Sequence, residues 1–159
     1  MIVHLSRGRW LIDKKIDRLA LPELISAPNP AYISLQSALF HHGLIEQIPS
    51  ILYAVTLARP RQFKTPMGTI SFHRMPPELF TGFELSGSDA KIATPEKALF
   101  DLLYLAPGRS RILSTLPELS IARAFQWRRL KEYTQQVKSS GRRTYIGERI
   151  KAIRSATAK

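Results

Sequence analysis

Residues 93–102 read ATPEKALFDL and contain the clearest helix start in the chain. Thr94 can cap the helix with its hydroxyl, Pro95 occupies the first helical position, where its missing N–H costs nothing, and Glu96 meets the positive end of the helix dipole. The apolar residues that follow recur on one continuous stripe: Ala98, Leu99, Leu102, Leu103 and Ala106. Because Pro107-Gly108 ends this pattern, we expect a core helix over residues 95–106.

A second helix is expected over residues 34–42. Ser34 is a suitable N-cap, and Gly43 suits the left-handed conformation that often ends a helix. The residues that share one face between them are Leu35, Ala38, Leu39 and His42. Their spacing of i, i+3, i+4 and i+7 predicts that this face packs on the core.

Two longer strands are expected after that helix. Residues 51–58 (ILYAVTLA) are β-branched and aromatic, as in a buried strand, and residues 69–74 alternate apolar with polar side chains. We expect the two strands to pair antiparallel, with a basic loop at 59–64 and a turn at 65–68 between them.

Two shorter strands are expected at 83–85 and 91–93, on either side of the turn-forming residues 86–89. Near the N-terminus, residues 2–6 and 9–12 form a predicted β-hairpin that turns at Arg7-Gly8. Together these elements predict an α+β fold, in which a small antiparallel sheet is flanked by helices, preceded by the hairpin and followed by a basic helical pair.

The net charge of the chain is +12, and most of it lies at the C-terminal end. From residue 120 to residue 159, eleven lysines and arginines oppose two glutamates, which gives this quarter +9 and leaves +3 for the preceding 119 residues. Two basic helices are expected here, over 122–138 and 143–157. The charge favours nucleic acid as a partner, although a solvated face or a landing site for an acidic toxin would have the same composition. The candidate phosphate contacts are Arg7, Arg9, Lys14, Lys15, Arg128, Arg129, Arg142 and Arg143.

Composition excludes several classes of protein. The chain has 159 residues, is 44% hydrophobic and has no cysteine, so it can bury a core but cannot form a disulfide or a thiolate metal site. No apolar run approaches the length of a membrane span, and the start MIVHLSRGRW lacks the apolar region of a signal peptide. We therefore expect a cytoplasmic protein that does not contact a membrane.

The sequence offers little reaction chemistry. Adjacent His41 and His42 would point about 100° apart on a helix, which does not suit a metal site. Glu84 followed by Asp89-Ala90-Lys91 faintly resembles the acids and lysine of metal-dependent nucleases, but such a triplet arises easily by chance. No metal and no cofactor are expected.

Three stretches of the chain follow one another in a distinctive order. Residues 31–45 read AYISLQSALFHHGLI, residues 65–72 read TPMGTISF, and residues 93–102 are the helix start described above. The first resembles the YISLxSALxxHGLI pattern, and the last the ATPEKALxDL pattern, of the AbiEi-type antitoxins of type IV toxin–antitoxin systems. The resemblance covers roughly the first 106 residues.

This resemblance implies a protein of two parts with a toxin as its counterpart. In such antitoxins an N-terminal winged helix binds operator DNA and represses the operon, and the α/β domain that follows supplies the antitoxic activity. The toxin is nucleotidyltransferase-like, and the antitoxin need not form a stable complex with it. Structural roles are expected for Tyr32, Ser34, Gly43, Thr94, Pro95, Glu96 and Asp101. For Asp101 we expect a hydrogen bond to the basic loop, at Arg59 or Arg61.

The N-terminal end departs from the family pattern. Residues 5–11 (LSRGRWL) resemble the wing hairpin, which in the family follows the helices of the winged helix. The recognition helix is therefore expected to be absent, through a truncated gene product or a misplaced start codon, and operator binding should be weakened because a wing contacts mainly phosphate. We expect three parts: a remnant wing hairpin over 1–15, an antitoxin domain over 16–120 and a basic helical tail over 121–159.

Three functions remain open on this basis. The first is an antitoxin and transcriptional autoregulator with no chemistry of its own. The second is an enzyme that acts on the toxin or on nucleic acid, such as a nuclease or an atypical kinase. The third is a non-specific nucleic-acid-binding module.

Overall fold

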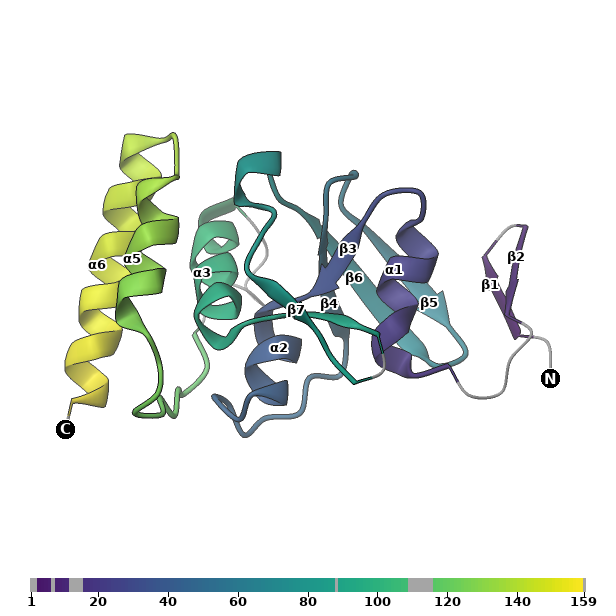
Figure 1. Ribbon diagram of the computed structural model, residues 1–159, viewed down its shortest axis with the longest axis horizontal. Helices are drawn as coiled ribbons and strands as arrows, with labels where there is room; N and C mark the ends of the chain where they lie inside the picture. Colours follow the sequence, from purple (N-terminus) through teal and green to yellow (C-terminus); the bar gives the residue numbers. More distant parts are fainter. Residues whose placement is uncertain (1–2, 7, 12–15, 88, 109–115, 159) are drawn as a thin grey trace.

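The computed structural model describes residues 3–6, 8–11, 16–87, 89–108 and 116–158. Figure 1 shows a β-sheet in the middle of the molecule, two neighbouring helices at one end and a β-hairpin at the other. These two helices are α5 (Trp127–Gln135) and α6 (Ser140–Thr157). The fold is α+β, as the sequence predicts. None of the helices within the described ranges has the length and apolar character that crossing a bilayer requires.

The central sheet has six strands in the order β5-β6-β4-β3-β8-β7. Its strands are β3 (Ala31–Ile33), β4 (Leu52–Thr56), β5 (Arg61–Thr65), β6 (Gly68–Arg74), β7 (Phe83–Leu85) and β8 (Lys91–Ala93). The β3–β4, β5–β6 and β7–β8 pairs are antiparallel, whereas β3–β8 and β4–β6 are parallel. The sheet is therefore mixed and not antiparallel as expected, while the two short strands β7 and β8 have the predicted bounds.

The prediction of an antiparallel pair from strands 51–58 and 69–74 is wrong, because β4 and β6 run parallel. The predicted basic loop at 59–64 is wrong as well, because most of it belongs to the edge strand β5. A turn at Pro66-Met67 joins β5 to β6, so β5 takes the antiparallel place beside β6. None of the side chains of β5 is fully buried, and its sequence RQFKT lacks the apolar pattern by which strands are recognised.

The helices of the body are α1 (Leu21–Ser26), α2 (Leu35–His41) and α3 (Pro95–Leu105), with short 3-10 turns η1 (Arg18–Ala20), η2 (Pro77–Leu79) and η3 (Ala106–Gly108). The helix α3 contacts α2, β8, α5 and α6, and Figure 1 shows it between the sheet and the two C-terminal helices. Nine of its eleven residues are buried, and three of these are charged. Charged groups in such a position need partners inside the protein.

The start of α3 is as predicted. The hydroxyl of Thr94 accepts a hydrogen bond from the backbone N–H of Lys97 at 3.3 Å, and Pro95 occupies the first helical position. Glu96 lies in the first turn, where its carboxylate also accepts the backbone N–H of Gln126 at 2.8 Å. This last bond ties the start of α3 to the start of α5.

The helix α2 begins directly after the predicted cap position, Ser34, and ends one residue before the predicted His42. Its last residue is His41, and Gly43 follows the cap with a φ of +74°, the left-handed conformation expected there. Its buried face consists of Leu35, Ala38 and Leu39. His42 is exposed, and its Nε2 forms a hydrogen bond with the carbonyl of Ala93 at 2.7 Å, which links α2 to the end of β8.

The remaining elements confirm the predicted hairpin and the two basic helices. The hairpin pairs β1 (Val3–Ser6) with β2 (Arg9–Leu11), and Gly8 in its turn has a φ of +79°. The helix α5 begins five residues later than the predicted 122. The hydroxyl of Ser139 caps α6 by accepting the N–H of Arg142 at 3.3 Å, and α6 begins at Ser140, three residues before the predicted 143. The apolar residues of α5 and α6 join the core cluster of the body through Leu130, Ile146 and Ile153.

Candidate functional site

Four polar side chains meet between β3 and α3: Tyr32, Ser34, Lys97 and Asp101, here called the Lys97 cluster. One carboxylate oxygen of Asp101 accepts hydrogen bonds from Tyr32 Oη at 2.9 Å and from Ser34 Oγ at 2.7 Å. The other oxygen forms an ion pair with Lys97 Nζ, which also donates to Tyr32 Oη at 3.0 Å. The side chains of Lys97 and Asp101 have no exposed surface, so each charge depends on the other and on the two hydroxyls.

Local structure places these groups together. Lys97 and Asp101 are four residues apart on α3 and therefore share one face of the helix. Tyr32 lies on β3, and Ser34 directly follows that strand. Ser34 occupies the N-cap position of α2, but the prediction that it caps the helix is wrong, because no capping bond forms and its hydroxyl donates to Asp101. A hydrogen bond to a carboxylate is stronger than a neutral one.

The Lys97 cluster joins two of the stretches that carry the family resemblance. Tyr32 and Ser34 belong to the first of these stretches, and Lys97 and Asp101 belong to the last. Sequence reasoning assigned structural roles to three of the four residues and missed Lys97. The available signal was a lysine four residues before an aspartate in a helix that is apolar on several faces, because charged residues in such a helix are buried only when they are paired.

The predicted partners of Asp101, Arg59 or Arg61, are wrong. The guanidinium of Arg61 lies over the ring of Phe63, 4.4 Å from its centroid. Asp101 faces the interior of the molecule, where Lys97 and the two hydroxyls satisfy it. The structural role expected for Asp101 stays a prediction.

Aromatic rings surround the ammonium group of Lys97. Its Nζ lies 5.5, 5.1 and 5.7 Å from the ring centroids of Tyr32, Phe100 and Tyr133. Attraction between the cation and the ring faces replaces part of the lost hydration. Tyr133 belongs to α5, so this cage joins the body of the protein to its C-terminal helices. Gly82 lies so close that an added Cβ would be 2.5 Å from Tyr133 Oη.

Burial dominates the electrostatics of the Lys97 cluster. Desolvation lowers the pKa of Lys97 and raises the pKa of Asp101, while the attraction between the two charges and their hydrogen bonds oppose both shifts. Burial also raises the pKa of Tyr32, with the nearby Asp101 as a second cause. A group that transfers protons to a substrate must come within hydrogen-bond reach of it. Because these side chains are enclosed, their arrangement suits the positioning of α3 on β3.

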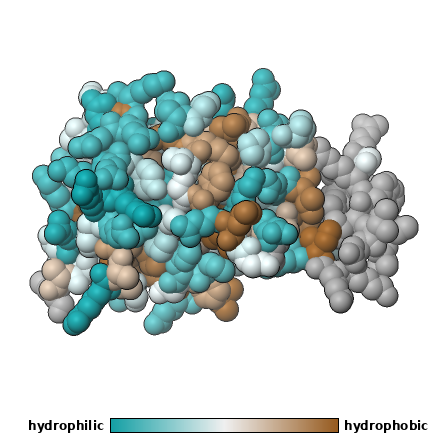
Figure 2. All heavy atoms as spheres, viewed as in Figure 1, coloured by the Kyte–Doolittle hydropathy of each residue, from teal (hydrophilic) through white to brown (hydrophobic). Residues whose placement is uncertain are grey.

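The second candidate region is the basic helical pair, which is the name used here for α5 and α6. Figure 2 shows hydrophilic residues gathered at this end of the molecule. Arg128 and Arg129 are exposed on α5, and Arg128 forms an ion pair with Glu132 at 3.0 Å. The guanidinium of Arg142 lies over the ring of Tyr104, 4.7 Å from its centroid. Stacking of this kind holds a guanidinium in a defined orientation.

Arg143 differs from the other predicted contacts on the basic helical pair. Its guanidinium donates to the carbonyl of Val137 at 2.5 Å and to that of Lys138 at 3.0 Å, immediately after the end of α5. Both carbonyls lie in the connection between α5 and α6, beyond the last residue of α5, and Arg143 supplies each with a side-chain donor. Its hydrogen bonds therefore hold the start of α6 against the connection that follows α5.

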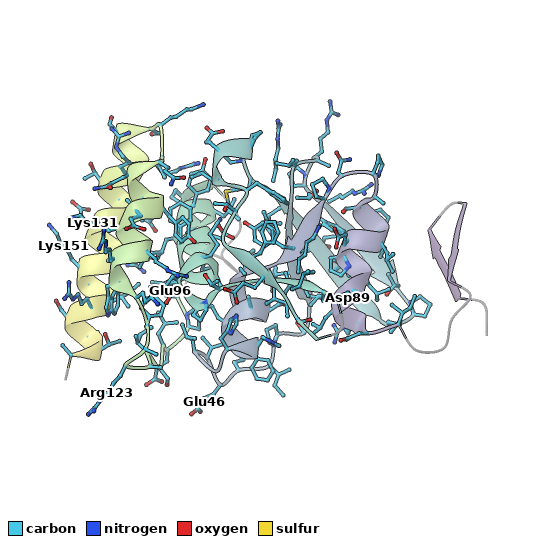
Figure 3. The ribbon with its side chains drawn as sticks, in the orientation of Figure 1. Glu46, Asp89, Glu96, Arg123, Lys131 and Lys151 are labelled. Atoms are coloured by element: carbon cyan, nitrogen blue, oxygen red, sulfur yellow. The ribbon has the colours of Figure 1, made fainter. Side chains whose placement is uncertain are left out.

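Sequence reasoning did not select some cations that the structure exposes. Lys131 on α5 and both Lys151 and Arg154 on α6 are exposed. Figure 3 labels Lys131 and Lys151, which both project from the basic helical pair. The available signal was the excess of lysine and arginine after residue 120. The spacing of these residues along the helices did not show which of them would be exposed.

The N-terminal predicted contacts fall largely outside the described residues. Arg7, Lys14 and Lys15 lie outside them, and for Arg9 the structure describes only the backbone, within β2. The phosphate contacts proposed for these four residues therefore stay predictions.

The residues of the faint nuclease triplet lie on the β7–β8 hairpin. Glu84 is exposed on β7, and Asp89 is exposed in the turn with a φ of +59°. Lys91 on β8 forms an ion pair with Glu23 of α1. Within the part of the chain that the structure describes, no three or more histidine, aspartate or glutamate side chains are grouped so that they could hold a metal ion.

Comparisons with protein-family models, with curated proteins and with solved structures found no match to this chain.

Proposed function

We propose that this chain is an antitoxin and transcriptional autoregulator of the AbiEi type, which acts in the cytoplasm against a nucleotidyltransferase-like toxin. The observation that carries the proposal is the Lys97 cluster. Two stretches far apart in the chain resemble the family's patterns, and their polar residues form one hydrogen-bonded network in the interior. Buried Lys97 and Asp101 need partners in any fold, and the support lies in the fact that the first of these stretches supplies them.

The basic helical pair supports the DNA-binding part of this proposal. Its exposed cations include Arg128, Arg129, Lys131 and Lys151, and Arg142 is held over an aromatic ring. Such cations bind phosphates and release counterions, so the affinity falls steeply as salt is added. Phosphate contacts fix the position of a protein on DNA but do not read bases. The pair would therefore strengthen operator binding without selecting the operator.

The test of the antitoxin proposal is growth rescue. A bacterial host that expresses the neighbouring nucleotidyltransferase-like gene from an inducible promoter should stop growing, and co-expression of this chain should restore growth. A folded chain that leaves growth arrested would contradict the proposal. If neutralisation needs no stable complex, the affinity-tagged chain should restore growth without retaining the toxin on a column.

The test of the DNA contact uses two triple variants of equal charge. Arg128→Gln with Arg129→Gln and Lys131→Gln removes three cations from the basic helical pair. The control, Arg59→Gln with Lys64→Gln and Arg74→Gln, removes three exposed cations of the body. We expect the first variant to lower the slope of log K against log salt by about 0.9 for each phosphate that the protein no longer neutralises. Equal slopes for the two variants would show that net charge alone drives the binding.

The net charge of +12 also suits a second function, that of a non-specific nucleic-acid-binding module. Such a module would bind operator and unrelated duplexes equally and would not restore growth. The enzyme alternative is tested by Asp89→Ala and Lys91→Ala in the rescue assay. Loss of rescue by both folded variants would favour chemistry at the β7–β8 hairpin, whereas unchanged rescue would remove that idea.

A further inference from the structure

An apolar groove lies between η1, the end of α2 and the chain that leads into β4. Its volume is about 380 Å³, and its lining includes Leu19, Phe40, Ile48 and Ile51. The basic helical pair contributes none of the residues that line it. The groove is therefore separate from the surface to which the proposed function assigns DNA binding.

Two large apolar side chains of this groove are exposed to water. The exposed fraction is 73% for Ile48 and 38% for Phe40. Within its described ranges the structure exposes four large hydrophobic residues. The other two, Leu24 and Leu85, do not line the groove. Neighbouring exposed apolar groups in a concave site, unlike scattered ones, mark a binding surface.

The walls of the groove are held in place by hydrogen bonds. The hydroxyl of Ser37, on α2, donates to the carbonyl of Ile51 at 3.3 Å and accepts the N–H of Tyr53 at 2.8 Å. Ser37 itself lines the groove, so the same side chain fixes α2 against the start of β4. A site that is already formed needs little reorganisation when a ligand binds.

The polar rim of the groove carries the positive charge of Arg18. Arg18 and His41 line it, and both are exposed. Among the described residues no carboxylate forms an ion pair with Arg18. The Arg18 guanidinium rests against Gly68, where an added Cβ would lie 2.9 Å from its Nη2. The groove thus combines apolar walls with an arginine for which the described ranges contain no ion-pair partner, and the charge of Arg18 complements a carboxylate.

We propose that this groove binds an amphipathic segment of a partner protein, in which a bulky apolar side chain is flanked by carboxylates. The apolar side chain packs between Phe40 and Ile48, and a carboxylate pairs with Arg18. Arginine binds carboxylates through two parallel hydrogen bonds, which gives the contact its orientation. This protein-docking site goes beyond the proposed contact with DNA and does not depend on it.

The test uses random 12-residue peptides displayed on phage. They are selected on the immobilised full chain and counter-selected on the variant Arg18→Gln with Ile48→Ser. Both positions are exposed, so the variant should fold. Enriched peptides are then synthesised with a fluorescent label, and their affinity is measured by anisotropy against single variants.

Two controls separate the groove from the general charge of the chain. Leu85→Ser removes an exposed apolar side chain elsewhere, and Arg123→Gln removes one exposed positive charge elsewhere (Arg123 is labelled in Figure 3). We expect enriched peptides to combine a bulky apolar residue with a nearby Asp or Glu. Ile48→Ser and Arg18→Gln should each weaken binding by about fivefold or more, and the controls by less than about twofold.

Three results would overturn the proposal. The first is that no peptide is enriched, or that enriched peptides lack acidic residues. The second is that Ile48→Ser weakens binding no more than Leu85→Ser, or Arg18→Gln no more than Arg123→Gln. The third is a dimer in sedimentation velocity that Ile48→Ser dissociates, because a second copy of this chain would then occupy the groove.

Discussion

Replacement of Lys97 by methionine removes the ammonium group from the interior and keeps most of the length and volume of the side chain. Asp101 then keeps its bonds to Tyr32 and Ser34 but loses its only cationic partner within the described residues. Loss of one member of a buried ion pair destabilises a protein by about 3–5 kcal/mol, because the other charge stays buried without compensation. Burial already raises the pKa of Asp101, so its carboxyl can take up a proton, which favours the lower end, about 3 kcal/mol.

The double variant Lys97→Met with Asp101→Leu provides the internal comparison. It leaves no buried charge, and the remaining penalty comes from the hydroxyls of Tyr32 and Ser34, which lose their acceptor. Removal of both members of a buried pair is often close to neutral when the replacements pack well. The double variant should therefore be more stable than Lys97→Met alone.

Denaturant unfolding followed by circular dichroism measures these free energies. In a thermal melt, the midpoint temperature of Lys97→Met should fall by about 6–12 °C, since a loss of 1 kcal/mol lowers it by about 2–4 °C in a chain of this size. Lys91→Met is the matched control, because Lys91 pairs with Glu23 through side chains that are 28% and 37% exposed. Such a pair contributes at most about 1 kcal/mol. The interpretation of the cluster fails if Lys97→Met and Lys91→Met unfold at the same denaturant concentration.

Two further predictions concern the ends of elements. Gly82→Ala should destabilise the protein by more than about 1 kcal/mol, because Gly82 has a φ of +78° and the new Cβ would meet the hydroxyl of Tyr133. Gly87→Ala, with no atom within 4 Å of its Cβ, should change the midpoint temperature little, and an equal loss in both variants would contradict the steric argument. Arg143→Gln should lower the free energy of unfolding by about 1–2 kcal/mol through loss of its carbonyl bonds. Arg129→Gln should weaken DNA binding in an anisotropy titration and leave the free energy of unfolding unchanged. If Arg129→Gln lowers stability and Arg143→Gln weakens only DNA binding, the roles given to these two arginines are wrong.

Local chemistry explains which elements were predictable. Thr94 and Pro95 act within one helical turn, so the start of α3 could be read from four residues. Gly43 and the hairpin β7–β8 were recognisable for the same reason, since turns depend on nearby backbone preferences. The strand β5 was missed because an edge strand buries few side chains. The parallel pairing of β4 with β6 follows from the position of β6 between β5 and β4 in the sheet, which the sequence does not reveal.

Site residues divide in the same way. The spacing of Lys97 and Asp101 could be read from the sequence, but their burial could not, because the partner Tyr32 lies 65 residues from Lys97 in the chain. Arg143 carried the same charge as Arg129 in the sequence, and only the structure shows that its guanidinium donates to the carbonyls of Val137 and Lys138. The groove beside α2 likewise has no sequence signal, because its lining comes from three separate segments.

The amino-acid sequence by itself determined the α+β character, the start of α3, the helix end at Gly43 and the concentration of positive charge after residue 120. The tertiary structure decided the mixed order of the sheet, the partners of Asp101 and which arginines donate to backbone carbonyls and which stay on the open surface. The physical reason is the distance along the chain over which each interaction acts. Caps, turns and net charge follow from neighbouring residues, whereas a buried charge is stable only where distant segments bring donors and acceptors to it.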